Sequence, residues 1–445
     1  MQPCRNGKLP PLPLRSYSRQ RKGEGSLADL HAQLAILRAK IATMEQRTFQ
    51  PATPRPSQPK ITQALEDMLD GWSQAGEVET PLGKHFECER LYPAYRRHGN
   101  VDIGSLAALP TNHLTSLADE GFPQCDPGRW AFLDTETTGL AGGSGTYAFL
   151  VGVGRITSDG FRVKQFFMRD FSEEASMLDA LTRHLADFEV LITYNGRAYD
   201  QPLLETRYRM SRARPPFSKM AHLDLLFGAR RLWKLCFDSC RLVELEYQIL
   251  GVEREGDIPG SLIPYVYFEY VRMGHSPRLG PVFEHNALDI VTLACLTAIV
   301  PRAFQSEGWD MLPARHPAEW VGLGRWLRQA GQLDQATRLF RKALTSGLAD
   351  ELTWRTMWDL AGLERKLEKP DSALALYAEL AGADNPFRPA ACEELAKHYE
   401  HKERNPAMAM EFVLIAMEVE VNPGLVKRKA RLEAKMHKPR SLRLL

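Results

Sequence analysis

Residues 129–302 alternate between short apolar runs and longer segments with helical periodicity. Strands and helices that alternate in this way bury a sheet between layers of helices. We therefore expect an α/β domain in this part of the chain. The strand-like runs occupy residues 129–136, 146–156, 161–170 and 190–195, and the helical segments occupy residues 173–188, 201–210 and 285–300.

The first strand of this domain runs directly into acidic residues, because RWAFLDTE ends with Asp134 and Glu136. Residues two apart on a strand point to the same face, so these carboxylates project together. Two carboxylates held side by side repel each other, and a hard divalent cation bound between them relieves that repulsion. The glycine-rich segment 141–145 that follows is expected to keep the neighbourhood open.

Two further polar motifs follow later in the domain. Asn195 ends a buried strand and Asp200 stands at the start of the next helix, the kind of edge where ligands gather in open α/β sheets. His285 and Asp289 lie one turn apart on an apolar helix and share a face. Four carboxylates suit two Mg²⁺ or Mn²⁺ ions placed for attack of water on a phosphodiester, and a histidine is a natural base for that water.

Three motifs, DTETTG, NGRAYD and HNALD, occur in this order. They resemble the motifs of the DEDD exonuclease superfamily, which includes the polymerase proofreading exonucleases. The wider pattern of GGSGTYAFLVGVG, LVELEYQILGVEREGDIPG and HNALDIVTL is similar to the YprB-type ribonuclease H-like family, some of whose members end in tetratricopeptide-like repeats. The resemblance covers residues 129–302 well, the later repeats loosely and residues 1–60 not at all. It implies a mixed five-stranded sheet flanked by helices.

The resemblance also implies roles for individual residues. Asp134, Glu136, Asp200 and Asp289 match the metal ligands of the superfamily, and His285 matches its general base. One departure concerns the last motif: this chain has a histidine at the spacing usual for the tyrosine branch, and Glu284 stands at the spacing of the histidine branch. His285 is therefore expected either to act as the base or only to orient the water.

Several polar or aromatic stretches allow two interpretations. Basic residues are frequent between Arg207 and Lys234, which fits either a solvated face or a phosphate-binding surface beside the metal site. Asn195 is either a turn residue or a residue that shapes the substrate site. For the segment 222–224 a structural role is favoured over a catalytic one. For the aromatic group Tyr265, Tyr267, Phe268 and Tyr270 a place in the core is favoured over a base-stacking platform.

The regions before the α/β domain are of a different kind. Residues 1–60 are basic and rich in proline, and we expect them to be disordered apart from a helix at 26–45. The leucines of this helix fit either a coiled coil that gives weak self-association or an amphipathic helix docked on its own protein. Residues 61–128 are expected to form an extension that packs on the core.

The C-terminal region is helical and repetitive. Asp334, Asp371 and Asn405 open similar segments in steps of 37 and 34 residues, close to the tetratricopeptide period. We predict an all-α array of tetratricopeptide-like repeats at 317–424, an architecture typical of protein binding, followed by a basic tail at 425–445.

Composition sets the remaining expectations. The net charge of +2 leaves nucleic acid open as a partner, and the seven cysteines form no zinc-binding spacing. The basic N-terminus lacks the apolar core of a signal peptide, and no stretch resembles a membrane span, so we expect a cytoplasmic protein without a membrane partner. The three motifs and the family resemblance, in turn, imply a two-metal 3′→5′ exonuclease acting on single-stranded DNA or RNA with a free 3′ end. The alternative is a protein-interaction scaffold whose nuclease-like domain is weakly active or inactive.

Overall fold

The structure is a computed structural model that describes Leu65, Leu69 and residues 72–118, 121–139, 145–304 and 316–437. The predicted basic N-terminus with its helix at 26–45 lies outside these residues. So do most of the glycine-rich segment 141–145 and the last residues of the predicted tail.

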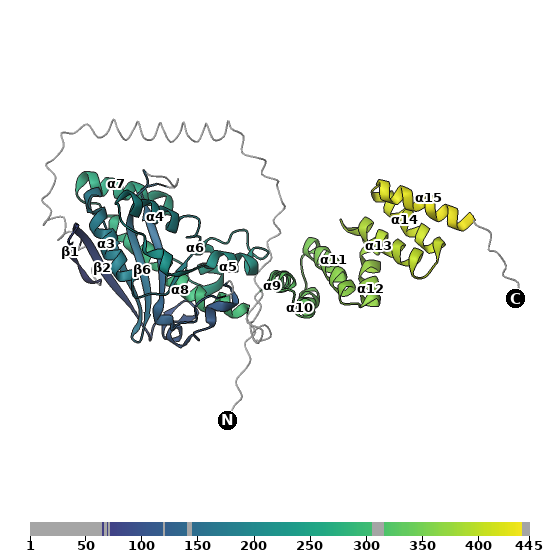
Figure 1. Cartoon of the computed structure of the whole chain (residues 1–445), viewed down its shortest axis with the longest axis horizontal. Helices are drawn as coiled ribbons and strands as arrows, with labels where there is room; N and C mark the ends of the chain where they lie inside the picture. Colours follow the sequence, from purple (N-terminus) through teal and green to yellow (C-terminus); the bar gives the residue numbers. More distant parts are fainter. Residues whose placement is uncertain are drawn as a thin grey trace, which may run out of the picture. The chain divides into compact units, whose positions relative to one another are not determined.

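A mixed sheet forms the centre of the α/β domain, in the strand order β1-β2-β7-β6-β5-β8-β9 (Figure 1). Strands β5, β8 and β9 are parallel to one another, and the other neighbours pair antiparallel. A separate two-stranded sheet is made by β3 (Arg97–His98) and β4 (Val101–Asp102). The strands of the large sheet are β1 (Ser73–Thr80), β2 (Gly83–Pro93), β5 (Trp130–Thr137), β6 (Ala148–Thr157), β7 (Gly160–Phe167), β8 (Val190–Thr193) and β9 (Ala221–Asp224).

The predicted α/β fold is confirmed, but the predicted count of five strands is too low for the sheet as a whole. The five strands expected within residues 129–302 are β5 to β9. The extension at 61–128 adds β1 and β2, because β2 pairs with β7 along its length from Phe86 to Pro93. This pairing buries Phe86 and Cys88 completely, so the extension is part of the sheet as well as packing on it.

Helices cover both faces of the sheet. On β5, Trp130 and Phe132 pack into the hydrophobic cluster that contains α5 and most of α8. Ala131 and Leu133, which point the other way, pack with α3, α4 and α7 (Figure 1). The helices of this domain are α3 (Glu174–Leu185), α4 (Asp200–Met210), α5 (Leu225–Trp233), α6 (Leu242–Leu245), α7 (Ile263–Met273) and α8 (Leu279–Ala303).

Helix α8 has 25 residues and enough apolar side chains to pass a length-and-composition test for a membrane span, contrary to the expectation from sequence. However, 72% of the apolar window is buried inside the protein. His285 and Asp289 also lie on α8, so it is better described as a core helix of the α/β domain.

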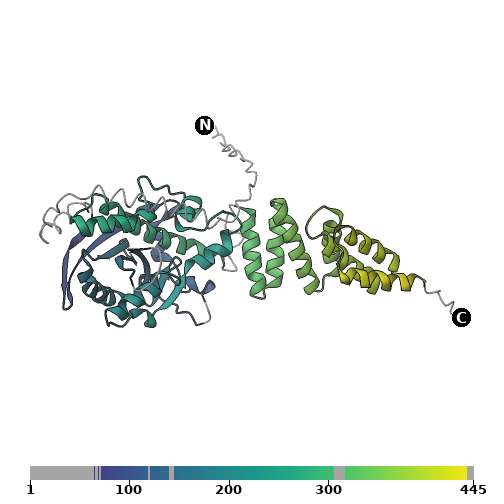
Figure 2. The same ribbon diagram turned by 90° about the horizontal axis from the view of Figure 1, so that it is seen from above.

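The C-terminal region is an all-α array, and Figure 2 shows its successive helices side by side. Ala336 and Ala373 are buried at the same position of α10 and α12, as the predicted repeat requires. In α14 the buried residue at that position is Ala409, whereas Ala407 is exposed, so the third repeat is offset from its predicted alignment. The helices are α9 (Pro317–Gln329), α10 (Leu333–Thr345), α11 (Asp350–Lys366), α12 (Pro370–Gly382), α13 (Arg388–His401), α14 (Pro406–Val419) and α15 (Pro423–His437).

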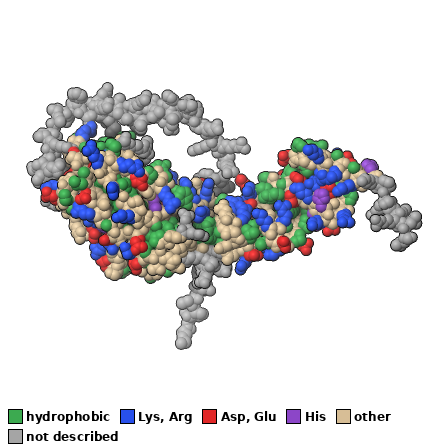
Figure 3. Space-filling model, viewed as in Figure 1, with side chains coloured by type: hydrophobic (Ala, Val, Ile, Leu, Met, Phe, Trp, Pro, Cys, Tyr) green, Lys and Arg blue, Asp and Glu red, His purple; other side chains and the backbone are tan. Residues whose placement is uncertain are grey.

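The basic tail expected from residue 425 is helical as far as His437, because α15 has a partner. The buried carboxylate of Glu400 on α13 receives Arg428, Arg431 and Lys435 from α15. On the face seen in Figure 3, Lys and Arg side chains gather over these last helices. The cations of the predicted basic tail therefore hold a terminal helix in place.

Candidate metal centre

The end of β5 carries Asp134 and Glu136 next to the neighbouring strand β6. Asp134 lies opposite Gly152 in the antiparallel pairing, and Glu136 lies opposite Leu150. A β-bulge follows Glu136 and ends the regular pairing. Within the described residues, no hydrogen bond or ion pair reaches the Glu136 carboxylate, which leaves its oxygens available to a ligand.

Asp200 is the first residue of α4, as predicted, and its side chain turns toward β5. The hydroxyl of Thr135 donates to Asp200 Oδ1 at 2.5 Å. The second motif thus meets the first through the residue that lies between the two acidic side chains of β5. The parallel pairing of β5 with β8, the strand that precedes the Asp200 loop, brings these segments together.

Helix α8 supplies the third motif. Asn286 Nδ2 donates to Asp134 Oδ2 at 2.8 Å, which fixes one carboxylate of β5 against the helix. On the next turn Asp289 Oδ2 lies 3.8 Å from His285 Nε2. The chain therefore brings the three sequence motifs to one place, and Asn286 is a contact residue that the sequence reasoning did not select.

Three charged residues that the sequence reasoning missed complete the surroundings. Arg254 Nη2 donates to Asp289 Oδ1 at 2.6 Å and Nη1 to Asp257 Oδ2 at 3.3 Å, while Nε donates to Glu246 Oε2 at 2.5 Å. Asp257 Oδ1 also lies 2.8 Å from His285 Nδ1. Their segment, LVELEYQILGVEREGDIPG, carries part of the family resemblance. Glu246 lies in its short helical part, whereas Arg254 and Asp257 lie in an irregular loop without a periodicity that would place single side chains.

The electrostatics of the site follow from crowding several half-buried carboxylates together. Burial, followed by repulsion from Asp289 and Asp200, raises the pKa of Asp134 well above its ordinary value. Burial and repulsion from Asp134 do the same to the pKa of Glu136. Burial raises the pKa of Asp200 to about 6 and also raises the pKa of Asp289, which Arg254 partly offsets. Each of these shifts is one that a bound cation would reverse.

The donor set fits a hard divalent cation, because the candidate ligands are all carboxylates and their mutual repulsion calls for positive charge. Across the described ranges, no three His, Cys, Asp or Glu side chains converge closely enough to hold an ion as they stand. Three of the four candidate carboxylates already accept a hydrogen bond. The donors are Asn286 to Asp134, Thr135 to Asp200 and Arg254 to Asp289.

The segment 222–224 supports the site from behind, in keeping with the structural role favoured from sequence. Asp224 caps α5 and accepts the backbone N–H groups of Asn195 and Arg197 at 2.7 and 3.1 Å. Asn195 itself has a left-handed φ of 66°, a conformation that asparagine tolerates better than most residues. Asp224 therefore shapes the loop that leads to Asp200.

The remaining candidates divide between core and surface. Tyr267 and Tyr270 are buried, and Tyr267 stacks on Phe149 with ring centroids 4.0 Å apart, whereas Tyr265 and Phe268 are exposed. Glu284 forms an ion pair with Arg90. In the basic stretch, Arg207 is buried against Glu174, and the exposed members are Arg209, Arg212, Arg214, Lys219, Arg230, Arg231 and Lys234.

Comparison with known proteins agrees with this geometry. Residues 131–300 match the family model of the RNase_H superfamily. A protein of Bacillus subtilis (strain 168) named Uncharacterized protein YprB is 32% identical over 327 residues, which cover 72% of this chain and 77% of that protein. The ribonuclease H-like domain supports a nucleic-acid-cleaving activity at the level of the superfamily, whose nucleases typically use divalent metals. The chain belongs to the YprB-type family of ribonuclease H-like proteins.

Proposed function

We propose that this protein is a metal-dependent 3′→5′ exonuclease that shortens single-stranded nucleic acid. The observation that carries the proposal is the meeting of Asp134, Asp200 and Asp289, from three separate elements, in one electrostatic cluster with Glu136. Several carboxylates held together repel one another and destabilise the fold unless a bound cation neutralises them. The order and residue types of the three motifs, which resemble those of DEDD exonucleases, support action from a 3′ end.

The four carboxylates would hold Mg²⁺ or Mn²⁺, and two such ions would supply charge that activates the attacking water and stabilises the leaving 3′-oxygen. Glu136 and Asp134 share a strand face and offer oxygens from β5, while Asp200 and Asp289 offer theirs from α4 and α8. Without cations this cluster would repel phosphate, so substrate binding as well as cleavage is expected to need the metal.

His285 is the proposed base. Asp257 accepts a hydrogen bond from His285 Nδ1, an assignment of the ring proton that leaves Nε2 free to accept a proton from water. The ring nitrogen Nε2 lies on the side of Asp289, at 3.8 Å from Oδ2. Asp257 would therefore orient the imidazole in the way that a carboxylate orients a catalytic histidine in other hydrolases.

The test uses matched single strands of DNA and RNA, labelled at the 5′ end, with Mn²⁺ present. The wild type should shorten at least one of them stepwise from its 3′ end, and Asp134→Asn should not. Asp179→Asn, which removes a surface acid paired with Arg183 on α3, serves as the control and should keep full activity. Absence of shortening by the wild type, or equal shortening by Asp134→Asn, would refute the proposal, and internal cleavage products would indicate an endonuclease.

A protein-binding role for the helical array is the second proposal. It is supported by exposed apolar side chains near its end, among them Leu414, Val419 and Val426. Exposed apolar side chains are a feature of many protein contact sites. A partner that copurifies stoichiometrically with the full-length chain, and is lost from the double variant Leu414→Asp, Val426→Asp, would support a scaffold. Detectable Mn²⁺-dependent shortening in the same preparation would show that both roles coexist.

A further inference from the structure

The guanidinium of Arg254 lies among the candidate metal ligands. Its side chain is only 4% exposed, and it contacts Asp289 at 2.6 Å and Asp257 at 3.3 Å. Asp289 is the candidate ligand of the third motif, so an arginine occupies one of the oxygens that a cation would need. Since an arginine stays charged at all ordinary pH values, this positive charge is permanent.

Arg254 is held in this place by groups other than Asp289. Its Nε donates to Glu246 Oε2 at 2.5 Å. The second oxygen of Glu246 accepts from Thr292 at 2.7 Å and lies 3.2 Å from His98 Nε2. Glu246 belongs to a π-helical turn, a local irregularity that is frequent at functional sites. The surrounding structure therefore positions the guanidinium independently of the contact with Asp289.

A divalent cation and a fixed guanidinium at one cluster of carboxylates must compete. Arg254 already holds Asp289 Oδ1, and a cation bound to the same carboxylate would lie close to the guanidinium. Two positive charges at close range repel each other strongly in a partly buried site. In the absence of metal, however, the same guanidinium neutralises part of the negative charge and stabilises the fold. Arg254 thus lowers the electrostatic cost of the empty cluster and weakens its attraction for an added cation.

We propose that Arg254 is a built-in counter-ion of the metal centre, which stabilises the metal-free carboxylate cluster and lowers its affinity for the divalent cation that uses Asp289. The inference rests on the metal centre of the proposed function, but it concerns metal affinity and stability and requires no nuclease assay. It implies that the cation depending on Asp289 binds more weakly than the carboxylate set alone would allow.

The experiment measures Mn²⁺ binding by calorimetry and thermal unfolding with and without Mn²⁺, on the full-length chain. Arg254→Met should unfold at a lower temperature than the wild type without Mn²⁺ and should regain most of that loss with it. Its affinity at the cation site that depends on Asp289 should rise by about tenfold or more, equivalent to about 1.4 kcal/mol. Adding Asp289→Asn to Arg254→Met should abolish this gain.

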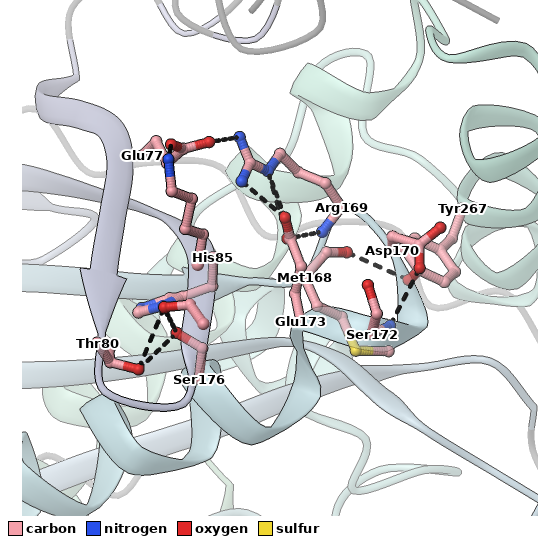
Figure 4. A network of polar contacts seen from close by, with 12 residues as sticks. Glu77, Thr80, His85, Met168, Arg169, Asp170, Ser172, Glu173, Ser176 and Tyr267 are labelled. Carbon is pink, nitrogen blue, oxygen red and sulfur yellow. Dashed lines mark hydrogen bonds and ion pairs between the residues drawn. The ribbon is translucent and has the colours of Figure 1, made fainter. Parts of the chain in front are cut away.

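Two further variants separate charge from the mere loss of a buried arginine. Arg254→Lys keeps the charge, so its Mn²⁺ affinity should stay within about threefold of the wild type. Arg169→Met is the matched control: Arg169 is also buried, and it pairs with Glu77 and Glu173, neither of which is a candidate ligand (Figure 4). It should lower the unfolding temperature equally with and without Mn²⁺ and leave Mn²⁺ affinity unchanged.

Each outcome decides the matter. Equal or weaker Mn²⁺ binding by Arg254→Met, with clear binding by the wild type, overturns the counter-ion role and leaves the metal centre intact. If Arg254→Met folds only when Mn²⁺ is present, the proposal is supported. If Arg254→Met stays unfolded with and without Mn²⁺, the proposal is wrong, because the cation cannot replace the guanidinium. Absence of Mn²⁺ binding by both the wild type and Arg254→Met would overturn the metal centre itself.

Discussion

Gly152 on β6 lies so close beneath Asn286 that a Cβ at residue 152 would come within 2.2 Å of the Asn286 side-chain oxygen. That oxygen accepts from Gln165 at 2.7 Å, and the Asn286 amide donates to Asp134 at 2.8 Å. The close approach of strand and helix therefore fixes the orientation of one candidate ligand.

Gly152→Ala should disturb this contact, because the buried Asn286 is tied at both ends and has little room to move. Overpacking of this kind should lower the free energy of unfolding by roughly 1–3 kcal/mol and reduce nuclease activity further than the stability loss explains. Urea denaturation and the 3′-shortening assay measure the two effects. Gly362→Ala in α11 has open space for its Cβ and should be neutral or slightly stabilising. Wild-type stability and activity in Gly152→Ala would contradict the argument.

Asp224→Ala should loosen the loop that leads to Asp200. The Asp224 carboxylate accepts three backbone N–H groups, from Asn195, Arg197 and Leu226, and the variant leaves all of them without this partner. We expect a loss of roughly 2–4 kcal/mol in unfolding free energy and a clear fall in activity at temperatures where the variant remains folded.

Asp126→Ala is the control for this prediction. Asp126 also caps a short helical turn, but it is exposed and accepts a single N–H, from Gly128. The cost there should be about 1 kcal/mol, with no effect on activity. Similar effects of the two substitutions would show that Asp224 has no special role in shaping the site.

His184 should make the protein acid-sensitive. It packs between Phe166 and Phe188, and burial together with Lys164 lowers its pKa to about 4. In the unfolded chain the histidine pKa is about 6.5, so between pH 6.5 and pH 4 the unfolded chain binds a proton and the folded chain does not. The free energy of unfolding therefore falls as the pH falls through this range.

His184→Leu removes this loss. Between pH 7.5 and pH 4.5 the difference in unfolding free energy, variant minus wild type, should shift in favour of the variant by roughly 2 kcal/mol. Denaturant titrations at the two pH values measure it, and His275→Gln at an exposed position should show no such shift. A pH-independent difference for His184→Leu would disprove the assignment.

Glu400→Ala should release the terminal helix α15. Arg428 and Arg431 lie 2.6 Å from the buried Glu400 carboxylate. Hydrogen bonds from Arg431 and Lys435 lower the pKa of Glu400. Without it, the cations of α15 repel one another, so trypsin should cut at Lys427 to Lys435 much faster while the α/β domain stays resistant. Glu433→Ala, on the exposed side of α15, should leave the cleavage rate unchanged. In the wild type, high salt should also speed trypsin cleavage of α15, because the ion pairs of Glu400 are partly exposed and salt screens them.

The fold class could be predicted from sequence where the signal is local. The apolar run before Asp134 and the helical period after Asp200 depend on neighbouring residues, and β5 and α4 occupy those places. The family assignment is confirmed as well. The roles of the ligand residues and of His285 stay predictions.

Other features depend on contacts between distant residues, and no local pattern reports them. The sequence of β2 resembles the other mixed segments around it, and its place in the sheet follows only from its pairing with β7. Arg254 meets Asp289 35 positions away through a loop without regular structure. A long apolar helix such as α8 is equally ambiguous, since burial inside a protein and burial in lipid require the same side chains.

The pairing of β2 with β7 has a practical consequence for anyone who wishes to excise the ribonuclease H-like domain. A fragment beginning at Arg129, where the family resemblance starts, would lack β2, the neighbour of β7 from Gly160 to Phe167. The exposed edge of β7 would then be open to strand addition by other molecules. Such a fragment is expected to aggregate during expression. The first residue of a soluble fragment of this domain should therefore be placed before Trp72, upstream of the first strand of the sheet.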